Sequence, residues 1–419
     1  MTWFAWILSL EREEILSGGI YLVNSILLFQ DLATTMPTHI SVSISAIAYA
    51  LQRIVQLLTW SFAFVTLDDI GLQSVAHKKT GEMGFNVVLG GYMSIKRVAH
   101  AIDANMWIPA DRESVVTLSE AILRLFRDKS DRKNRQQARL MWLVEKYGVE
   151  GFKKAVIAEI ESYDRGVKVE NTQPTPNDTF KRRELVGIHK QPQDGKVRIG
   201  ILVPAGRLSF KECREIADLA EKYSGEEVRL TVEQNIILPN VNESVVENLL
   251  KEDCLNGESR LKVNPGFIEG NVVSCTGAQF CGLALIETKS NAEALAKKLE
   301  ELVTVDKPIR IHWTGCPNSC GQVQCADIGI MGAPARKEVN GKKLAVPGCN
   351  IFVGGQIGED SHLSLDPIKT GIPLEEKYLI PALVDILKSD FGAVEKNQRA
   401  NAYDASETTN GLLPELLSK

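Results

Sequence analysis

Short apolar runs and helical repeats of apolar residues alternate along most of this chain. The run from Gly84 to Gly91 (GFNVVLGG) predicts a strand that enters a tight glycine turn. Apolar residues at helical spacing predict helices over 115–127 and 136–147. A polar stretch with two prolines over 170–183 then predicts a linker, so the first strand-and-helix unit ends there.

A second series of elements begins near position 185. The pattern predicts strands over 197–203, 228–232, 236–239 and 309–313, and a helix over 243–250. Two further helices are expected to begin at capping boxes, one formed by Ser209 and Glu212 and the other by Ser290 and Glu293. The region 185–392 is therefore expected to be α+β.

One internal repeat is visible in the pattern. The strand Phe85 to Gly91 matches Cys349 to Gly355, and the same offset along the chain aligns Ile122 with Ile386. A second match at one offset favours a duplication over coincidence, so we expect a pseudo-twofold fold.

The segment 1–80 differs from the rest of the chain. Apolar stretches cover 19–29 and 40–67, and the second is interrupted by Gln52, Arg53 and Gln56. Neither gives the uninterrupted run of about 18 residues typical of a membrane-spanning helix, and no signal or transit pattern is present. A membrane anchor, an irregular helical extension and an aberrant start of the reading frame remain alternatives; we expect no membrane partner.

Composition narrows the class of protein further. A chain of 419 residues is expected to form two or three domains. Its net charge of -5, without a basic run, argues against a nucleic-acid partner.

Five of the eight cysteines lie between positions 275 and 325. Such crowding in a long chain favours a reducing compartment and a metal site over a disulfide framework. Cys275 and Cys281 form a C-x5-C pair, and Cys316 and Cys320 form a C-x3-C pair further along the chain. Four thiolates flanked by glycines suit an iron-sulfur cluster, and structural zinc is the alternative.

The other cysteines are expected to be inert or weak candidates. Cys213, Cys254 and Cys349 are interpreted as small core or surface residues. Cys325 follows closely after Cys320 and is a rival ligand.

Several segments together resemble the assimilatory ferredoxin-nitrite reductases of the nitrite/sulfite reductase family. They are CTGAQFCG from Cys275, IETK from Ile286, HWTGCPNSCGQ from His312, ADIG from Ala326, FVGG from Phe352, RLTVEQNI from Arg229 and NRQQARLMW from Asn134. The resemblance covers about 84–392. Gln279, Phe280 and Ser319 favour a nitrite over a sulfite reductase, which is the alternative within the family.

The resemblance implies a set of cofactors and site residues. A 4Fe-4S cluster is expected on Cys275, Cys281, Cys316 and Cys320, with Cys320 also the axial ligand of a sirohaem iron and the catalytic position. A plastid location, or a cytoplasmic one in a prokaryote, reduced ferredoxin as donor, nitrite as substrate, ammonium as product and a monomeric state are implied as well. Candidates for the sirohaem periphery are Arg135, Arg139, Arg229, Gln234 and Asn235.

The resemblance also implies the α+β nitrite/sulfite reductase fold. The expected parts are an atypical apolar segment (1–80), a partial first sirohaem/4Fe-4S-type domain (81–165), a linker (166–184), a ferredoxin-like repeat (185–255), the 4Fe-4S and sirohaem-binding domain (265–395) and a polar tail (396–419). The segment 1–80 matches neither the family's first ferredoxin-like repeat nor its anion-binding arginines, lysine and asparagine. An inactive homologue that binds only the cofactors is therefore an alternative to the enzyme.

Overall fold

The computed structural model describes residues 42–43, 69–95, 97–131, 133–134, 137–175, 184–256, 259–339, 341–357 and 362–396. The expectations for the segment 1–68, for most of the polar tail and for the central part of the linker therefore fall largely outside the described residues. Within that first segment the structure describes one short strand, β1 (Val42–Ser43), which pairs with β9 (Arg207–Leu208).

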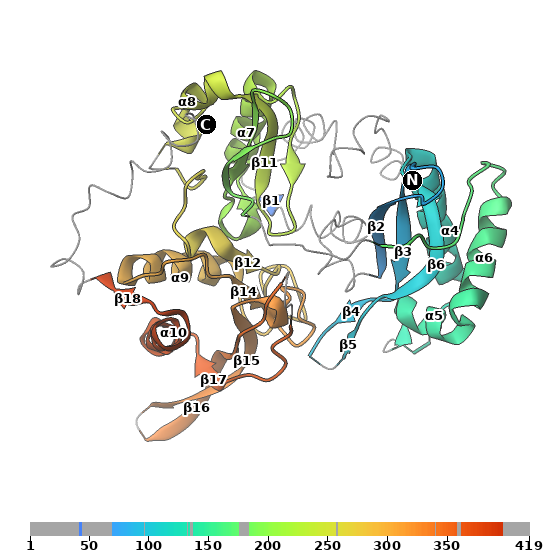
Figure 1. The fold of residues 1–419 in the computed structure, drawn as a ribbon. Coiled ribbons are helices and arrows are strands. Elements are labelled where there is room, and N and C mark those ends of the chain that lie inside the picture. The colour runs from blue at the N-terminus through green and yellow to red at the C-terminus, as the bar shows by residue number, and fades with distance from the viewer. Residues whose placement is uncertain are drawn as a thin grey trace.

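The first unit is an antiparallel sheet of three strands covered by helices (Figure 1). Phe85, Val87 and Leu89 of the central strand are buried, as the predicted apolar run requires. The strand ends at Gly90, whose φ of 83° gives the expected glycine turn. The strands are β2 (Ile70–Ala76), β3 (Met83–Leu89) and β6 (Ile102–Pro109), and the helices are α4 (Arg112–Lys129), α5 (Leu140–Tyr147) and α6 (Val149–Glu161).

Helix α5 is shorter than its sequence pattern predicts. The prediction began at Gln136, whereas the helix begins at Leu140 with Arg139 as its N-cap residue. Arg139 has the extended backbone angles typical of an N-cap residue, and its side chain pairs with Asp69, as described below. Helix α4 begins after Asp111, which caps it by accepting a hydrogen bond from the Ser114 N–H at 2.9 Å.

A hairpin of β4 (Tyr92–Met93) and β5 (Val98–Ala99) extends from the first unit toward the third (Figure 1). The N–H of Ile95 at its turn donates to the Pro317 carbonyl at 3.0 Å. The hairpin thus contacts the segment between Cys316 and Cys320.

The second unit is a four-stranded antiparallel sheet in the order β10–β11–β8–β7. Helix α7 follows the capping box of Ser209 and Glu212, which confirms that prediction. The elements are β7 (Gly187–Lys190), β8 (Lys196–Ile201), α7 (Phe210–Tyr223), β10 (Arg229–Leu230), β11 (Ile236–Asn242) and α8 (Val246–Leu249), with 3-10 turns η3 (Pro204–Gly206), η4 (Glu243–Val245) and η5 (Asp253–Leu255).

The third unit is a mixed sheet in the order β12–β14–β15–β16–β17. Strands β12, β14 and β15 are parallel neighbours, and β15, β16 and β17 are antiparallel. The bounds are β12 (Val272–Ser274), α9 (Lys289–Leu302), β13 (Val303–Thr304), β14 (Ile311–Thr314), β15 (Ile328–Val339), β16 (Lys342–Val353), β17 (Lys369–Pro373), α10 (Glu376–Phe391) and β18 (Val394–Glu395), with 3-10 turns η6 (Glu269–Asn271) and η7 (Val323–Cys325).

The second predicted capping box is wrong. Helix α9 begins at Lys289, and its N-cap residue is Thr288 rather than Ser290. The Thr288 hydroxyl donates to the Cys275 carbonyl at 2.7 Å, and Glu293 pairs with arginines of the second unit and the segment after it. Ser290 and Glu293 therefore lie inside the helix, past its N-cap residue, and Glu293 forms tertiary ion pairs instead of a capping contact.

The predicted duplication is visible in the arrangement of elements. In the first unit β2, β3 and β6 form an antiparallel meander followed by α4, and in the third β15, β16 and β17 form one followed by α10. The first residues of α4 and α10, Arg112 and Glu376, are separated by the same interval as the matched strands. The mixed helix and strand content agrees with the expected α+β class.

Candidate metal centre

The two cysteine pairs follow two neighbouring parallel strands. Cys275 comes directly after β12, and Cys316 follows shortly after β14. The carboxyl ends of parallel strands meet at one edge of a sheet, so both loops leave the sheet at the same place. Two backbone hydrogen bonds join them, from the Cys275 N–H to the Trp313 carbonyl at 3.0 Å and from the Leu285 N–H to the Gly315 carbonyl at 2.7 Å.

Two glycines allow these loops to approach so closely. Gly277 has a φ of 75°, a left-handed conformation that other residues rarely adopt. At Gly321 a Cβ would lie 2.0 Å from the Trp313 carbonyl oxygen. Glycines next to the cysteines are expected because they suit a cofactor site. In the structure they also allow the two loops to pack tightly against the sheet.

The four thiols are electrostatic neighbours. Cys320 as a residue is exposed, but protein atoms crowd its thiol; this desolvation first, and then charge on Cys275, Cys316 and Cys281, raises the pKa of Cys320 to about 11, while Arg139 acts in the opposite direction. Burial first, and then charge on Cys275 and Cys281, also raises the pKa of Cys316. All four cysteines are free thiols.

The donor set fits an iron-sulfur cluster. Among the described residues no three His, Cys, Asp or Glu side chains lie close enough together to hold one metal ion. A 4Fe-4S cluster takes one thiolate on each of its four irons, and soft thiolates are its preferred ligands. The Gly315 N–H donates to the Cys275 sulfur at 3.1 Å. A backbone donor of this kind stabilises the negative charge of a cluster.

Among the eight cysteines only Cys320 is exposed; Cys316 is buried, and Cys275 and Cys281 are partly buried. Cys325 is buried in a small core with Met93 and Ile357. Burial raises the pKa of Cys325 to about 12, so its thiol is protonated at neutral pH. Cys213 and Cys349 are buried in cores of the second and third units, and Cys254 is partly buried.

Arg139 brings positive charge from the first unit to this site. It lies close enough to Cys320 to affect its pKa, stacks on Tyr92 at 4.8 Å from the ring centroid, and pairs with Asp69 at 2.6 Å. Its buried Nε has no hydrogen-bond partner among the described residues. Arg135 lies outside the described residues.

The other three candidates for the sirohaem periphery lie in the second unit. The Gln234 amide donates to the Ser274 carbonyl at 2.8 Å and accepts from the Ser274 N–H at 3.0 Å. Asn235 accepts from the Val203 N–H at 3.0 Å, and Arg229 pairs with Glu227 at 2.5 Å. Gln234 thereby fixes the residue before Cys275, and the contact of all three with sirohaem stays a prediction.

Sequence reasoning missed Lys289, which the structure places behind Cys275. Lys289 is buried, and its Nζ donates to the Ala205 carbonyl at 2.5 Å and to the Ser274 carbonyl at 3.3 Å. The signal was present in the helical pattern, since Lys289 shares the buried face of α9 with Ala292, Ala296 and Leu299.

The family model described as the nitrite and sulphite reductase 4Fe-4S domain matches residues 58–163 and 269–401. The model described as the nitrite/sulfite reductase ferredoxin-like half domain matches residues 189–252. The first model matches twice, on the two segments that contain the related meanders.

Curated relatives agree with the family models. The chain is 43% identical over 322 residues to a chloroplastic ferredoxin–nitrite reductase of Betula pendula, covering 76% of this chain and 53% of that protein. It is 45% identical over 313 residues to a ferredoxin–nitrite reductase of Synechococcus elongatus, covering 75% and 58%. The chain thus spans little more than half the length of these relatives.

A solved structure has the same fold. The structure described as the Mycobacterium tuberculosis NirA protein superposes with a TM-score of 0.65 at 23% identity, covering 84% of this chain and 67% of that chain. At this identity the likeness concerns the fold alone.

Proposed function

Because the chain belongs to the nitrite and sulphite reductase family, we propose that it carries the redox centre of a ferredoxin-dependent assimilatory nitrite reductase. The reaction is the six-electron reduction of nitrite to ammonium. The observation that supports the proposal is that Cys275, Cys281 and Cys316 all influence the Cys320 thiol electrostatically, beside the β12–β14 pair.

The cysteines have two roles in this proposal. All four would hold a 4Fe-4S cluster, and the exposed Cys320 would also hold the sirohaem iron. Sirohaem would supply the iron chemistry for the reduction of nitrite. Arg139 contributes positive charge beside Cys320 and suits a carboxylate-bearing cofactor.

The chain's other residues position this centre. Gln234 holds Ser274 on one side, and the β4–β5 hairpin holds Pro317 on the other. Rigid support of this kind keeps ligands in place as electrons arrive one at a time. Reduced ferredoxin is the proposed donor and nitrite the proposed substrate, as in the names of the relatives.

The names of the relatives also bear on location and assembly. Chloroplastic relatives support a plastid location and the cyanobacterial relative a cytoplasmic one. We propose that the protein acts as a monomer. No helix among the described residues is long and apolar enough to cross a membrane.

Anaerobic purification followed by absorption spectroscopy and an ammonium assay tests the proposal. Sirohaem coupled to the cluster gives strong visible bands, and reduced ferredoxin with nitrite should then yield ammonium. Visible bands without ammonium would support the cofactor-binding alternative, and sulfide formation from sulfite would support the sulfite reductase. A colourless protein containing zinc would contradict the cluster itself.

A further inference from the structure

Lys289 is a buried lysine that the proposed reaction does not use. Only 2% of its surface is exposed, and it is the first residue of α9. An amine in the interior is unfavourable unless hydrogen bonds or opposite charge compensate it. The carbonyl oxygens of Ala205 and Ser274 accept hydrogen bonds from the Lys289 amine. The opposite charge that compensates the amine must come from a neighbouring acidic group.

The surrounding backbone holds the amine in one place. Ala205 has a φ of 48°, which turns the chain toward α9, and at the next residue, Gly206, a Cβ would lie 2.6 Å from the Gln234 Cβ. The side-chain amide of Gln234 in turn forms hydrogen bonds with both the carbonyl and the N–H of Ser274. The lysine is therefore fixed to the residue that precedes Cys275.

Cys275 is the main opposite charge that Lys289 faces. Burial is the largest influence and lowers the pKa of Lys289 to about 7; charge on Cys275 and on Glu287 opposes this, and Arg207 adds to it. The Cys275 sulfur also receives the Gly315 N–H. Cys275 thus has the amine behind it and an amide donor on its sulfur.

We propose that the protonated amine of Lys289, held in place behind Cys275, raises the reduction potential of the cluster on Cys275. Reduction adds negative charge to the cluster, and a cation held nearby in a poorly polarisable interior stabilises the reduced form more than it would in water. Lys289 is a positioning and tuning residue, since it contacts backbone rather than substrate. The inference rests on the proposed cluster.

The test is a redox titration of the full chain, reconstituted anaerobically with ferrous iron and sulfide. Lys289→Gln keeps a hydrogen-bond donor but removes the charge, and Lys289→Met removes both. Lys298→Met is the matched control, because Lys298 lies on the same helix, is 46% exposed and pairs with Glu301 at 3.0 Å. Electron paramagnetic resonance of the reduced cluster at each applied potential gives the midpoint.

Both Lys289 variants should have more negative midpoint potentials than the unmodified chain, and the control should match it. A midpoint unchanged in Lys289→Gln overturns the inference while leaving the proposed function intact. Loss of the cluster from both variants, with the control still loaded, overturns it in favour of a purely structural lysine. An unmodified chain that takes up no cluster overturns the proposed function first, and this inference with it.

Discussion

At the scale of single residues, the four ligand candidates are distinguished by what surrounds each sulfur. Cys275 has an amide donor on its sulfur, Cys316 is buried, and Cys320 is exposed beside the positive charge of Arg139. The sequence identified the four cysteines through their spacing. It could not identify the contacts of Lys289 or the hydrogen bonds between Gln234 and Ser274, because the partners of these side chains lie far away along the chain.

Replacing Cys320 by serine tests the role of the exposed thiol. Cys320→Ser should abolish the coupled visible bands and reduce ammonium formation at least a hundredfold, because a hydroxyl is a poor ligand for both metals. Absorption spectra and the ammonium assay measure these effects. Cys254→Ser is the control, since Cys254 is only partly buried and lies in the second unit; a sirohaem spectrum that survives in Cys320→Ser would rule out the bridging role.

At the scale of elements, long-range partners decided what local patterns left open. The capping box of Ser209 formed as its local pattern predicts, whereas α9 has Thr288 as its N-cap residue, and the Thr288 hydroxyl donates to the Cys275 carbonyl. Helix α5 likewise begins later than its pattern predicts, after Arg139, whose side chain pairs with the distant Asp69. Strand pairing of β12 with β14 is likewise absent from any local pattern.

Arg260 joins α7 to α9 and should stabilise the contact between the second and third units. It pairs with Glu212 at 2.7 Å and with Glu293 at 3.1 Å. Arg260→Gln should lower the free energy of unfolding by about 1 to 2 kcal/mol, because charge-assisted hydrogen bonds are lost from partly buried carboxylates. Urea denaturation measures the change. Lys211→Gln, at an exposed position of α7, should have little effect, and equal losses in both variants would contradict this role.

The ion pairs of Glu293 also predict that the free energy of unfolding depends on pH. Burial alone would raise the pKa of Glu293, but hydrogen bonds and charge from Arg260 and Lys297 outweigh it and hold the pKa below its usual value. A lowered pKa in the folded state contributes stability above the usual range of glutamate, and this contribution is lost as the pH falls below about 4. The difference in unfolding free energy between the unmodified chain and Arg260→Gln should therefore shrink on acidification. A gap that stays constant from neutral pH to about pH 3 would exclude this linkage.

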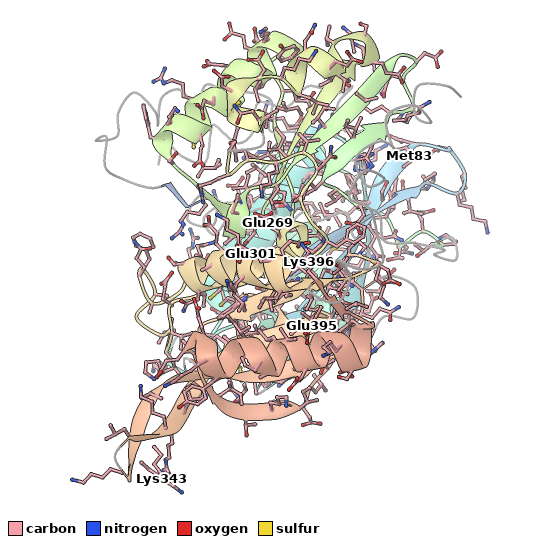
Figure 2. All side chains as sticks on the ribbon, turned by 90° about the vertical axis from the view of Figure 1, so that its left-hand side faces the viewer. Met83, Glu269, Glu301, Lys343, Glu395 and Lys396 are labelled. Carbon is pink, nitrogen blue, oxygen red and sulfur yellow. The ribbon has the colours of Figure 1, made fainter. Side chains whose placement is uncertain are left out.

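At the scale of the whole molecule, all three units contribute residues to the candidate metal centre. The second unit reaches it through Gln234, and the first through Arg139 and the β4–β5 hairpin. By contrast, the far end of the β15–β16 hairpin, marked by Lys343, projects away from the body (Figure 2). The duplication was readable from the sequence because its two copies keep one spacing, whereas the way in which the units meet was not.

A small apolar core couples the first unit to the third. Met93 of the hairpin packs with Cys325 and Ile357. Met93→Ala should lower the unfolding free energy by about 2 kcal/mol through loss of buried apolar surface, and should speed release of the cluster. Thermal unfolding and the decay of visible absorption in the presence of a chelator measure both effects. Met83→Ala is the control at a 38% exposed position (Figure 2), and cluster loss at the control's rate would show that the hairpin does not support the site.

The parallel pairing of β12 with β14 has a consequence for how the protein acquires its metals. The two cysteine pairs are separated by the whole of α9, and parallel strands can pair only through a long crossover connection of this kind. A shift of β14 by one position would send the neighbouring side chains to the opposite face of the sheet. The brown colour of a four-iron centre should therefore develop only after β12 and β14 have paired in the correct register. Visible absorption would then report the rate of this slow, long-range stage of folding.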